Sequence, residues 1–223
     1  MIAVGTLQSE LSAGARARVR LLPMALEHVD ALTEAATTSR DTFDLAPVPR
    51  DRAEMVRYVE RALVEQETNR SVPFVVEHVG SLVGSYRLMS LEWWSWPEGP
   101  VEVDGEPRVV EKDPPDVAEI GHAWLTPATQ RTEVNSSVCH LLMRHAFEAW
   151  RVHRLVLKTD ARNTRSRNAI TRLGGKPEGI LRSHSPAADG VVRDTALFSI
   201  LPAEWPAVRM RLESALSATH NRR

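Results

Sequence analysis

Hydrophobic and polar positions recur along this chain with two different periods, which divide it into candidate strands and helices. Residues 49–67 place Met55, Val59, Ala62 and Leu63 on one stripe, which is typical of a helix with one buried face. The segment 72–91 has two β-rich runs around a Gly-Ser turn and predicts a hairpin. The whole pattern predicts strands at 17–24, 117–125 and 153–160, hairpins at 72–91 and 178–200, and helices at 25–38, 49–67, 164–175, 202–216 and after the loop 130–136.

Strands and helices follow one another without a repeat or an obvious linker. This order favours a single α/β or α+β domain around one mixed sheet. We expect that domain to span residues 17–217, with tails at 1–16 and 218–223. Residues 97–116 are rich in proline, glycine and acids, so they predict an inserted loop or a short hairpin.

Composition narrows the possible partners. The net charge is −1 and 26% of the residues are charged, which disfavours nucleic acid and anionic membranes as partners. No apolar run has the length of a membrane span, and the first 17 residues do not resemble a signal peptide. The single cysteine, Cys139, lies within an apolar helical pattern and excludes both an internal disulfide and a cysteine-rich metal cage. We expect a cytoplasmic protein without a metal.

Two polar loops follow predicted strands and precede predicted helices. Unpaired N–H groups and the helix dipole make such a helix start a place for anions, often phosphates. The first loop supplies amides, hydroxyls and a cation from Gln130, Arg131, Thr132, Asn135 and Ser136. The second contains Asn163 and Ser166. Either loop alone is equally well explained as a structural turn, but parallel strands would bring both to one sheet edge, where ligands of open sheets bind.

Three segments together resemble a known family. "EIGHAWLTPATQRTEVNSS", "LVLKTDARNTRSRNAITRLGGKPEGILRSH" and "RDTALFSI" are similar to the GNAT superfamily of acyl-CoA-dependent N-acyltransferases, in its RimJ/RimL-like branch. The resemblance covers residues 17–213. It implies a single-domain α/β fold with a mixed, mostly antiparallel sheet that is splayed in the middle.

The resemblance also implies an activity. Acetyl-CoA would be the co-substrate, and the acetyl group would pass directly to a primary amine of a small molecule or of a protein or peptide N-terminus. A homodimer is a further expectation. Two alternatives stay open. One is a GNAT-like module that binds a ligand or a partner without catalysis, and the other is a transferase that uses another donor such as succinyl-CoA.

Carried onto this chain, the family's pyrophosphate loop departs from its usual sequence. The family reads Gln/Arg-x-x-Gly-x-Gly/Ala, whereas here Gln130 is followed by Glu133 and Asn135 at the glycine positions. A carboxylate beside two phosphates is unfavourable, although Glu133 suits the first turn of a helix and Arg131 can offset its charge. The cofactor contacts that the resemblance implies are Trp124, Leu125, Thr126, Gln130, Arg131, Thr132, Glu133, Val134, Asn135, Ser136 and Asn163.

The resemblance further implies two catalytic residues. Glu119 would take the proton of the acceptor amine, directly or through water, and His122 is a weaker candidate for the same role. A solvated edge carboxylate is the plainer interpretation of Glu119. Ser166 would protonate the departing thiolate, unless it only caps the following helix.

Other residues suit the acceptor side. Arg182 and His184 alternate on one predicted strand, so they are candidates for the acceptor wall, or else for a surface charge ladder with Arg193 and Asp194. Trp93 and Trp94 belong to a cluster of three tryptophans. We expect this cluster to contact the acceptor, with a core or dimer contact as the alternative.

Overall fold

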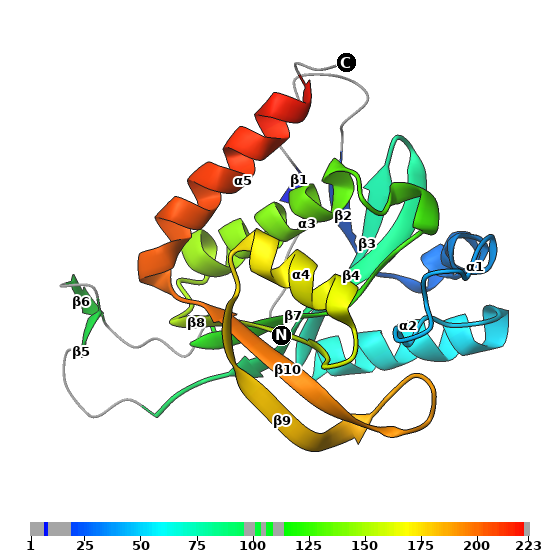
Figure 1. The fold of residues 1–223 in the computed structure, drawn as a ribbon, viewed down its shortest axis with the longest axis horizontal. Coiled ribbons are helices and arrows are strands. Elements are labelled where there is room, and N and C mark those ends of the chain that lie inside the picture. Colours follow the sequence, from blue (N-terminus) through cyan, green and yellow to red (C-terminus); the bar gives the residue numbers. More distant parts are fainter. Residues whose placement is uncertain (1–6, 9–18, 96–100, 104–105, 109–113, 221–223) are drawn as a thin grey trace.

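An eight-stranded sheet organises the chain (Figure 1). The computed structural model describes residues 7–8, 19–95, 101–103, 106–108 and 114–220. The strands lie in the order β1 (Leu7–Gln8), β2 (Val19–Pro23), β3 (Ser71–His78), β4 (Ser81–Glu92), β7 (Val117–Leu125), β8 (Arg154–Asp160), β10 (Val192–Ile200) and β9 (Lys176–Pro186). All neighbours are antiparallel except β7 and β8, which run parallel. The predicted mixed, mostly antiparallel sheet is confirmed.

Helices cover both faces of this sheet (Figure 1). One face carries α1 (Val29–Thr37) and α2 (Arg52–Glu67). The other carries α3 (Glu133–Arg144), α4 (Thr164–Leu173) and α5 (Trp205–His220). Short 3-10 turns η1 (Leu26–His28), η2 (Pro127–Thr129) and η4 (Pro202–Glu204) precede α1, α3 and α5, and a π-helical turn η3 (His145–Ala149) follows α3.

The alternation of side chains along the central strands separates two hydrophobic cores. In β3, Val72, Phe74 and Val76 join the core under α3 and α5, whereas Val75 joins the core under α1 and α2. Successive strand residues point to opposite faces, so a strand covered on both sides is apolar throughout. This explains why the run around 72–76 is uninterrupted by solvent-facing charges.

Several elements differ in extent from the predictions. The pair β1–β2 includes Leu7 and Gln8, which fall in the predicted N-terminal tail, and α5 continues to His220, beyond the predicted limit at 217. Within 97–116, the strands β5 (Val101–Val103) and β6 (Glu106–Arg108) pair with each other, as the short-hairpin alternative requires. The long helix expected after the loop 130–136 changes to π geometry after Arg144, where Trp150 N–H bonds to the carbonyl of His145.

Candidate functional site

The parallel strands β7 and β8 separate near their carboxyl ends. Their pairing runs from Val117 opposite Arg154 to Ile120 opposite Leu157, although β7 continues to Leu125 and β8 to Asp160. The pairing of β7 with β4 is also irregular there, because His122 has a φ of 47° and the register shifts beside it. This β-bulge bends β7. The splay expected in the middle of the sheet is therefore present.

The N-terminus of α3 lies just beyond the separated end of β7. Thr132 caps the helix, since its hydroxyl accepts a hydrogen bond from Val134 N–H at 3.2 Å. The exposed Arg131 precedes it in a left-handed conformation, with a φ of 61°. Glu133 is the first helical residue and is partly buried. The other first-turn N–H groups, the Arg131 side chain and the hydroxyl of Ser136 thus remain available to an anion.

Two of the predicted cofactor contacts have side chains that are engaged elsewhere. The amide of Gln130 donates to the Thr42 hydroxyl at 2.7 Å and to the carbonyl of Leu125 at 2.9 Å. Asn135 accepts a hydrogen bond from the buried Tyr86 hydroxyl at 2.7 Å. These residues can offer backbone groups to a phosphate, but their side chains instead fix the loop to its neighbours. The hydrogen bonds to Thr42 and Tyr86, two residues distant in the sequence, therefore set the orientation of the Gln130 and Asn135 side chains.

Buried side chains limit three other predicted cofactor contacts to their backbones. Trp124 packs edge-on against Phe43 in the core under α1 and α2. Leu125 and Val134 belong to the opposite core. Thr126 shares a hydrogen bond with Thr129 at 2.9 Å, which stabilises the turn before α3.

The start of α4 supplies the second polar loop. Asn163 is its N-cap, and Oδ1 of Asn163 accepts a hydrogen bond from Ser166 N–H at 2.9 Å. The residue that caps α4 is therefore Asn163 and not Ser166. Over the described part of the chain the hydroxyl of Ser166 has no hydrogen-bond partner, which leaves it available to a ligand. Arg165 donates to the Thr42 carbonyl at 2.5 Å, so the loop between α1 and α2 is tied to both polar loops.

Glu119 lies on β7 immediately before the strands separate. Its Oε2 accepts hydrogen bonds from Lys158 Nζ at 2.8 Å and from the Ser90 hydroxyl at 3.0 Å. A Cβ built on Gly121 would come within 3.3 Å of Oε1, so this second oxygen lies beside the β7 backbone at the opening. Glu119 is thus buried and anchored through Oε2, with no hydrogen bond to Oε1 from any described residue.

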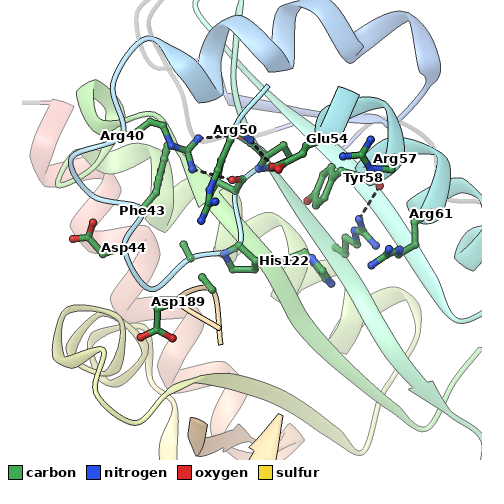
Figure 2. Close-up of a pocket in the computed structure, with 16 residues that line it drawn as sticks. Arg40, Phe43, Asp44, Arg50, Glu54, Arg57, Tyr58, Arg61, His122 and Asp189 are labelled. Carbon is green, nitrogen blue, oxygen red and sulfur yellow. Dashed lines mark hydrogen bonds between the residues drawn. The ribbon is translucent and has the colours of Figure 1, made fainter. Parts of the chain in front are cut away.

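A pocket of about 660 Å³ opens on the α2 face of the sheet (Figure 2). It lies between the loop from α1 to α2, helix α2 itself, the strands β4 and β7, and the turn between β9 and β10. Its lining includes the side chains of Arg57, Tyr58, Arg61, Arg87 and His122. The volume is in the range of small-molecule sites.

His122 forms part of the floor of this pocket. Strand parity alone would place it on the face opposite Glu119, three positions earlier. The bulge at His122 reverses this. The His122 ring lies 5.9 Å from that of Tyr58 on α2, and Glu119 is on the same face of the sheet, because its neighbours Ala118 and Ile120 point into the core under α3 and α5. Burial, and then the charges of Arg87 and Arg61, lower the pKa of His122 to about 4. The imidazole is therefore neutral at neutral pH.

Arg87 crosses the pocket floor from β4. It is fully buried, and its guanidinium donates to Glu65 at 2.8 Å and to the carbonyl of Tyr58 at 3.3 Å. The guanidinium also lies 4.7 Å from the centre of the Tyr58 ring. A buried charge needs such partners, and here they join β4 to α2 and fix the orientation of Tyr58.

The other predicted acceptor residues do not line this pocket. Trp94 stacks on His153, and the backbone N–H of Trp94 donates to the Asp116 carboxylate, at the end of β7 opposite to the bulge. Trp93 is 38% exposed beside it. Arg182 is exposed on β9, and His184 contacts the Thr195 hydroxyl at 3.1 Å. The left-handed Ser183 between them, with a φ of 47°, breaks the alternation that placed Arg182 and His184 on one side.

The β9–β10 hairpin reaches the pocket through its turn instead. Ala188 and Asp189 are lining residues, and Arg162 holds the Asp189 carboxylate at 2.8 Å while also binding Asp160. These contacts lower the pKa of Asp189, mainly through the hydrogen bond from Arg162. The turn is thereby fixed to the loop before α4.

The pocket residues on α2 and β4 were not predicted from the sequence. Arg57 and Arg61 are four apart in a helix, so a shared face was foreseeable. Arginines on the exposed side of an amphipathic helix are common, however, and carry no signal of a site by themselves. Arg87 was a better signal of a site, because a charged residue inside the apolar run of residues 82–91 needs a polar or charged partner.

Among the described residues, no helix is long and apolar enough to cross a membrane, and no group of three His, Cys, Asp or Glu is placed to bind a metal ion.

We compared the sequence and the fold of this chain with those of known proteins. Residues 18–176 match the model of the acetyltransferase (GNAT) domain family, which is more than two thirds of the chain. Among curated proteins, none matches the sequence. Solved structures do match, and a presumed acetyltransferase from T. thermophilus is 27% identical, with a TM-score of 0.72 over 97% of this chain and 99% of that one.

Two more distant structures share the fold. RimJ of Mycobacterium smegmatis, in complex with CoA-disulfide, is 22% identical, with a TM-score of 0.71 over 95% of this chain and 93% of its own. RimL, a ribosomal L7/L12 alpha-N-protein acetyltransferase, is 16% identical, with a TM-score of 0.67 over 90% and 99% of the two chains. At these identities the likeness is one of fold.

Proposed function

The chain belongs to the GNAT acetyltransferase family, and from this premise we propose that it is a member of the RimJ/RimL-like branch. We further propose that its acceptor is a primary amine that enters through the pocket beside α2. The protein is an acyl-CoA-dependent N-acetyltransferase with acetyl-CoA as its co-substrate. The observation that carries the proposal is the separation of β7 from β8, because it opens the sheet between the N-terminus of α3 and the pocket.

The residues at the sheet edge fit acetyl-CoA. Its pyrophosphate needs hydrogen-bond donors and positive potential, which the first turn of α3, Arg131 and Ser136 provide. The Thr132 hydroxyl already donates to the Thr129 carbonyl at 2.6 Å, so Thr132 serves as the cap. Glu133 opposes them with its negative charge, so binding relies on backbone N–H groups more than in a glycine-rich loop. When bound, acetyl-CoA supplies the thioester that the amine attacks.

Residues of this chain then act at the opening. Glu119 would receive the proton of the amine at Oε1, directly or through a water molecule, while Lys158 and Ser90 hold Oε2. The neutral His122 would accept a hydrogen bond from the amine and orient it. Backbone N–H groups of β7 beyond Ile120 would polarise the thioester carbonyl, and the Ser166 hydroxyl would protonate the thiolate.

Direct transfer suits this arrangement. The lone Cys139 is buried in α3, where burial raises the pKa of its thiol to about 12, so it is not a nucleophile for a covalent intermediate. Holding the amine and the thioester side by side then lowers the barrier, because the reaction no longer depends on an encounter of two free molecules. The acceptor can be a small molecule or a peptide N-terminus, as in the relative that acetylates ribosomal L7/L12. A homodimer and a cytoplasmic location are part of the same proposal.

A pair of variants at the α3 cap tests acetyl-CoA binding. Thr132→Asp keeps a capping oxygen but adds a charge where the pyrophosphate would lie, and Thr132→Asn keeps the cap without the charge. Titration calorimetry should show that wild type and Thr132→Asn bind acetyl-CoA and that Thr132→Asp binds it at least fivefold more weakly, corresponding to about 1 kcal/mol. If acetyl-CoA does not bind to the wild type, or if both variants bind equally, the proposed site is wrong. Release of CoA thiol in the presence of primary amines then measures transfer.

A further inference from the structure

Arginines dominate the pocket beside α2. Five of them line it, namely Arg40, Arg50, Arg57, Arg61 and Arg87, against three acids, Asp44, Glu54 and Asp189. With His122 neutral, the lining has a formal charge of +2, whereas the whole chain has −1. The pocket is therefore a local concentration of positive charge on a nearly neutral protein.

Two of these arginines have hydrogen-bond partners within the protein. Arg87 is paired with Glu65, and the guanidinium of Arg40 donates to the carbonyls of Ala36, Val48 and Pro49 at 2.8–3.2 Å. These contacts are structural. They fix the orientation of the Arg40 guanidinium, but they do not neutralise its positive charge, because backbone carbonyls carry no net charge.

The remaining three have unused donors. Arg50, Arg57 and Arg61 are exposed, and no acceptor for their guanidinium groups is found in the described part of the chain. Neither Glu54 nor Asp189, two of the lining acids, forms an ion pair with these three arginines. Glu54 accepts from the backbone N–H of Arg50 at 2.8 Å, and Asp189 is bound by Arg162.

The arrangement of these groups is directional. Arg57 and Arg61 project from α2 at one end of the pocket, whereas Asp44 and Asp189 lie at the other (Figure 2). Residues four apart in a helix have Cβ atoms about 5–6 Å apart, so the two guanidinium groups can hold one anion between them. The charge of Arg61 reaches His122 on the pocket floor, since it contributes to the lowered pKa of that residue.

We infer that the acceptor is an anionic amine, a primary amine that carries a carboxylate or a phosphate, and that Arg57 and Arg61 bind this acidic group. The inference rests on the proposed function and names its substrate class. Planar guanidinium groups bind carboxylates and phosphates through paired charge-assisted hydrogen bonds. Such an anion fills the donors that the protein leaves unused.

Electrostatics explains why the amine needs the acidic group. An ammonium ion alone would be repelled by a positive pocket, and the acidic group on the same molecule offsets this repulsion. Once bound, the neighbouring cations favour loss of the ammonium proton. For an α-amino group, with an ordinary pKa of about 7.7–8.0, a small shift is enough to give the nucleophilic free amine at neutral pH.

Matched peptides test the inference. We would use amidated tetrapeptides with N-terminal alanine that differ only at the second residue, as aspartate, phosphoserine, asparagine or lysine. Each is measured for acetyl transfer and, by calorimetry with CoA present, for binding. The variants are Arg57→Gln and Arg61→Gln, and the control is Arg172→Gln on α4, an exposed arginine that does not line the pocket.

The aspartate or phosphoserine peptide should bind and react about tenfold better than the asparagine peptide, the gain expected of one charge-assisted hydrogen bond. The lysine peptide should be the poorest. Arg57→Gln and Arg61→Gln should each remove most of this preference, measured as the ratio of the acidic to the asparagine peptide within the same variant. Arg172→Gln should leave that ratio intact. The ratio of aspartate to phosphoserine separates a carboxylate ligand from a phosphate ligand.

Two results would overturn the inference: equal binding of the acidic and the neutral peptides, or a preference for acidic peptides that survives both α2 variants. Failure of the proposed function looks different, because acetyl-CoA would then not bind or no peptide would be acetylated. The calorimetric comparison still decides between acidic and neutral ligands in that case.

Discussion

Lys158 holds Glu119 through a single carboxylate oxygen. The ammonium nitrogen lies 2.8 Å from Oε2, and the Ser90 hydroxyl contacts the same atom. Because β7 and β8 are paired up to Ile120 and Leu157, this ion pair lies at the point where they begin to separate. One oxygen anchors the carboxylate, and the other is left for chemistry at the opening.

Replacing Glu119 by glutamine should therefore slow transfer without unfolding the protein. General-base help is typically worth about 10²–10⁴-fold, so we expect kcat to fall by at least about 100-fold while the affinity for acetyl-CoA is unchanged. Ser90→Ala is the control, since it removes a contact to Oε2 and leaves Oε1 in place. A loss of less than about threefold in Glu119→Gln would assign proton removal to water or to His122.

At the other end of the reaction, Ser166→Ala should lower kcat and leave acetyl-CoA binding and stability nearly unchanged. Its hydroxyl does not cap α4, because Asn163 does so through the backbone N–H of Ser166. Asn163→Ala is the matched variant and should cost about 1 kcal/mol of unfolding free energy. Denaturant melts and steady-state rates separate the two. Normal turnover in Ser166→Ala would leave protonation of the thiolate to solvent.

Glu133 places a carboxylate where the family has glycine. Glu133→Gln should tighten CoA binding by about 1 kcal/mol, roughly fivefold in Kd, because it removes repulsion from the pyrophosphate at a partly exposed position. Glu133→Gly should tighten binding at least as much but lower the melting temperature, since α3 loses an acid from its first turn and gains a flexible residue. Titration calorimetry measures the affinity. Weaker binding in both variants would reveal a positive role for Glu133.

His122 should make the fold sensitive to acid. Its pKa is about 4 in the folded protein, against about 6.5 when unfolded, so the unfolded chain binds the proton more readily. The contribution is complete above pH 6.5 and is lost as the pH falls from 6.5 to 4. At pH 4.5 this amounts to about 2–3 kcal/mol relative to pH 7.

Urea unfolding of wild type and His122→Asn at the two pH values measures this loss. Asparagine tolerates the positive φ at this position, so the substitution leaves the bulge unstrained. The variant should lose less stability on acidification than the wild type. It will still lose some, because burial also lowers the pKa of His140 and of His145. Equal losses in both proteins would mean that His122 is solvated.

For Trp94, which lies outside the pocket, we expect almost no effect on acceptor binding. Trp94→Ala should leave the KM for the acceptor within about twofold, because Trp94 stacks on His153 away from the pocket lining. Its effect should appear in stability, or in dimerisation measured by analytical ultracentrifugation. A large rise in KM would return the cluster to the acceptor site, where the sequence first suggested it.

The sequence by itself determined most elements of this protein and led to the prediction that a cofactor binds at one edge of its sheet. Hydrophobic periods of 2 and 3.6 are local properties, so they predicted the strands, the hairpins and the amphipathic α2. The capping residues Thr132 and Asn163 likewise act on the next turn of their own helices. A family resemblance in contiguous motifs then fixed the splayed sheet and the co-substrate.

Only the tertiary structure decided which side chains are engaged within the protein and which remain available to a ligand. Gln130 and Asn135 match or replace motif positions, yet their side chains are hydrogen-bonded to Thr42 and Tyr86, which are distant in the sequence. One bulge reversed the strand parity of His122. The α2 arginines and Asp189 share a pocket, although α2 packs on β3 and the β9–β10 turn belongs to the opposite edge of the strand order. Such contacts depend on how distant segments pack, which no local pattern in the chain encodes.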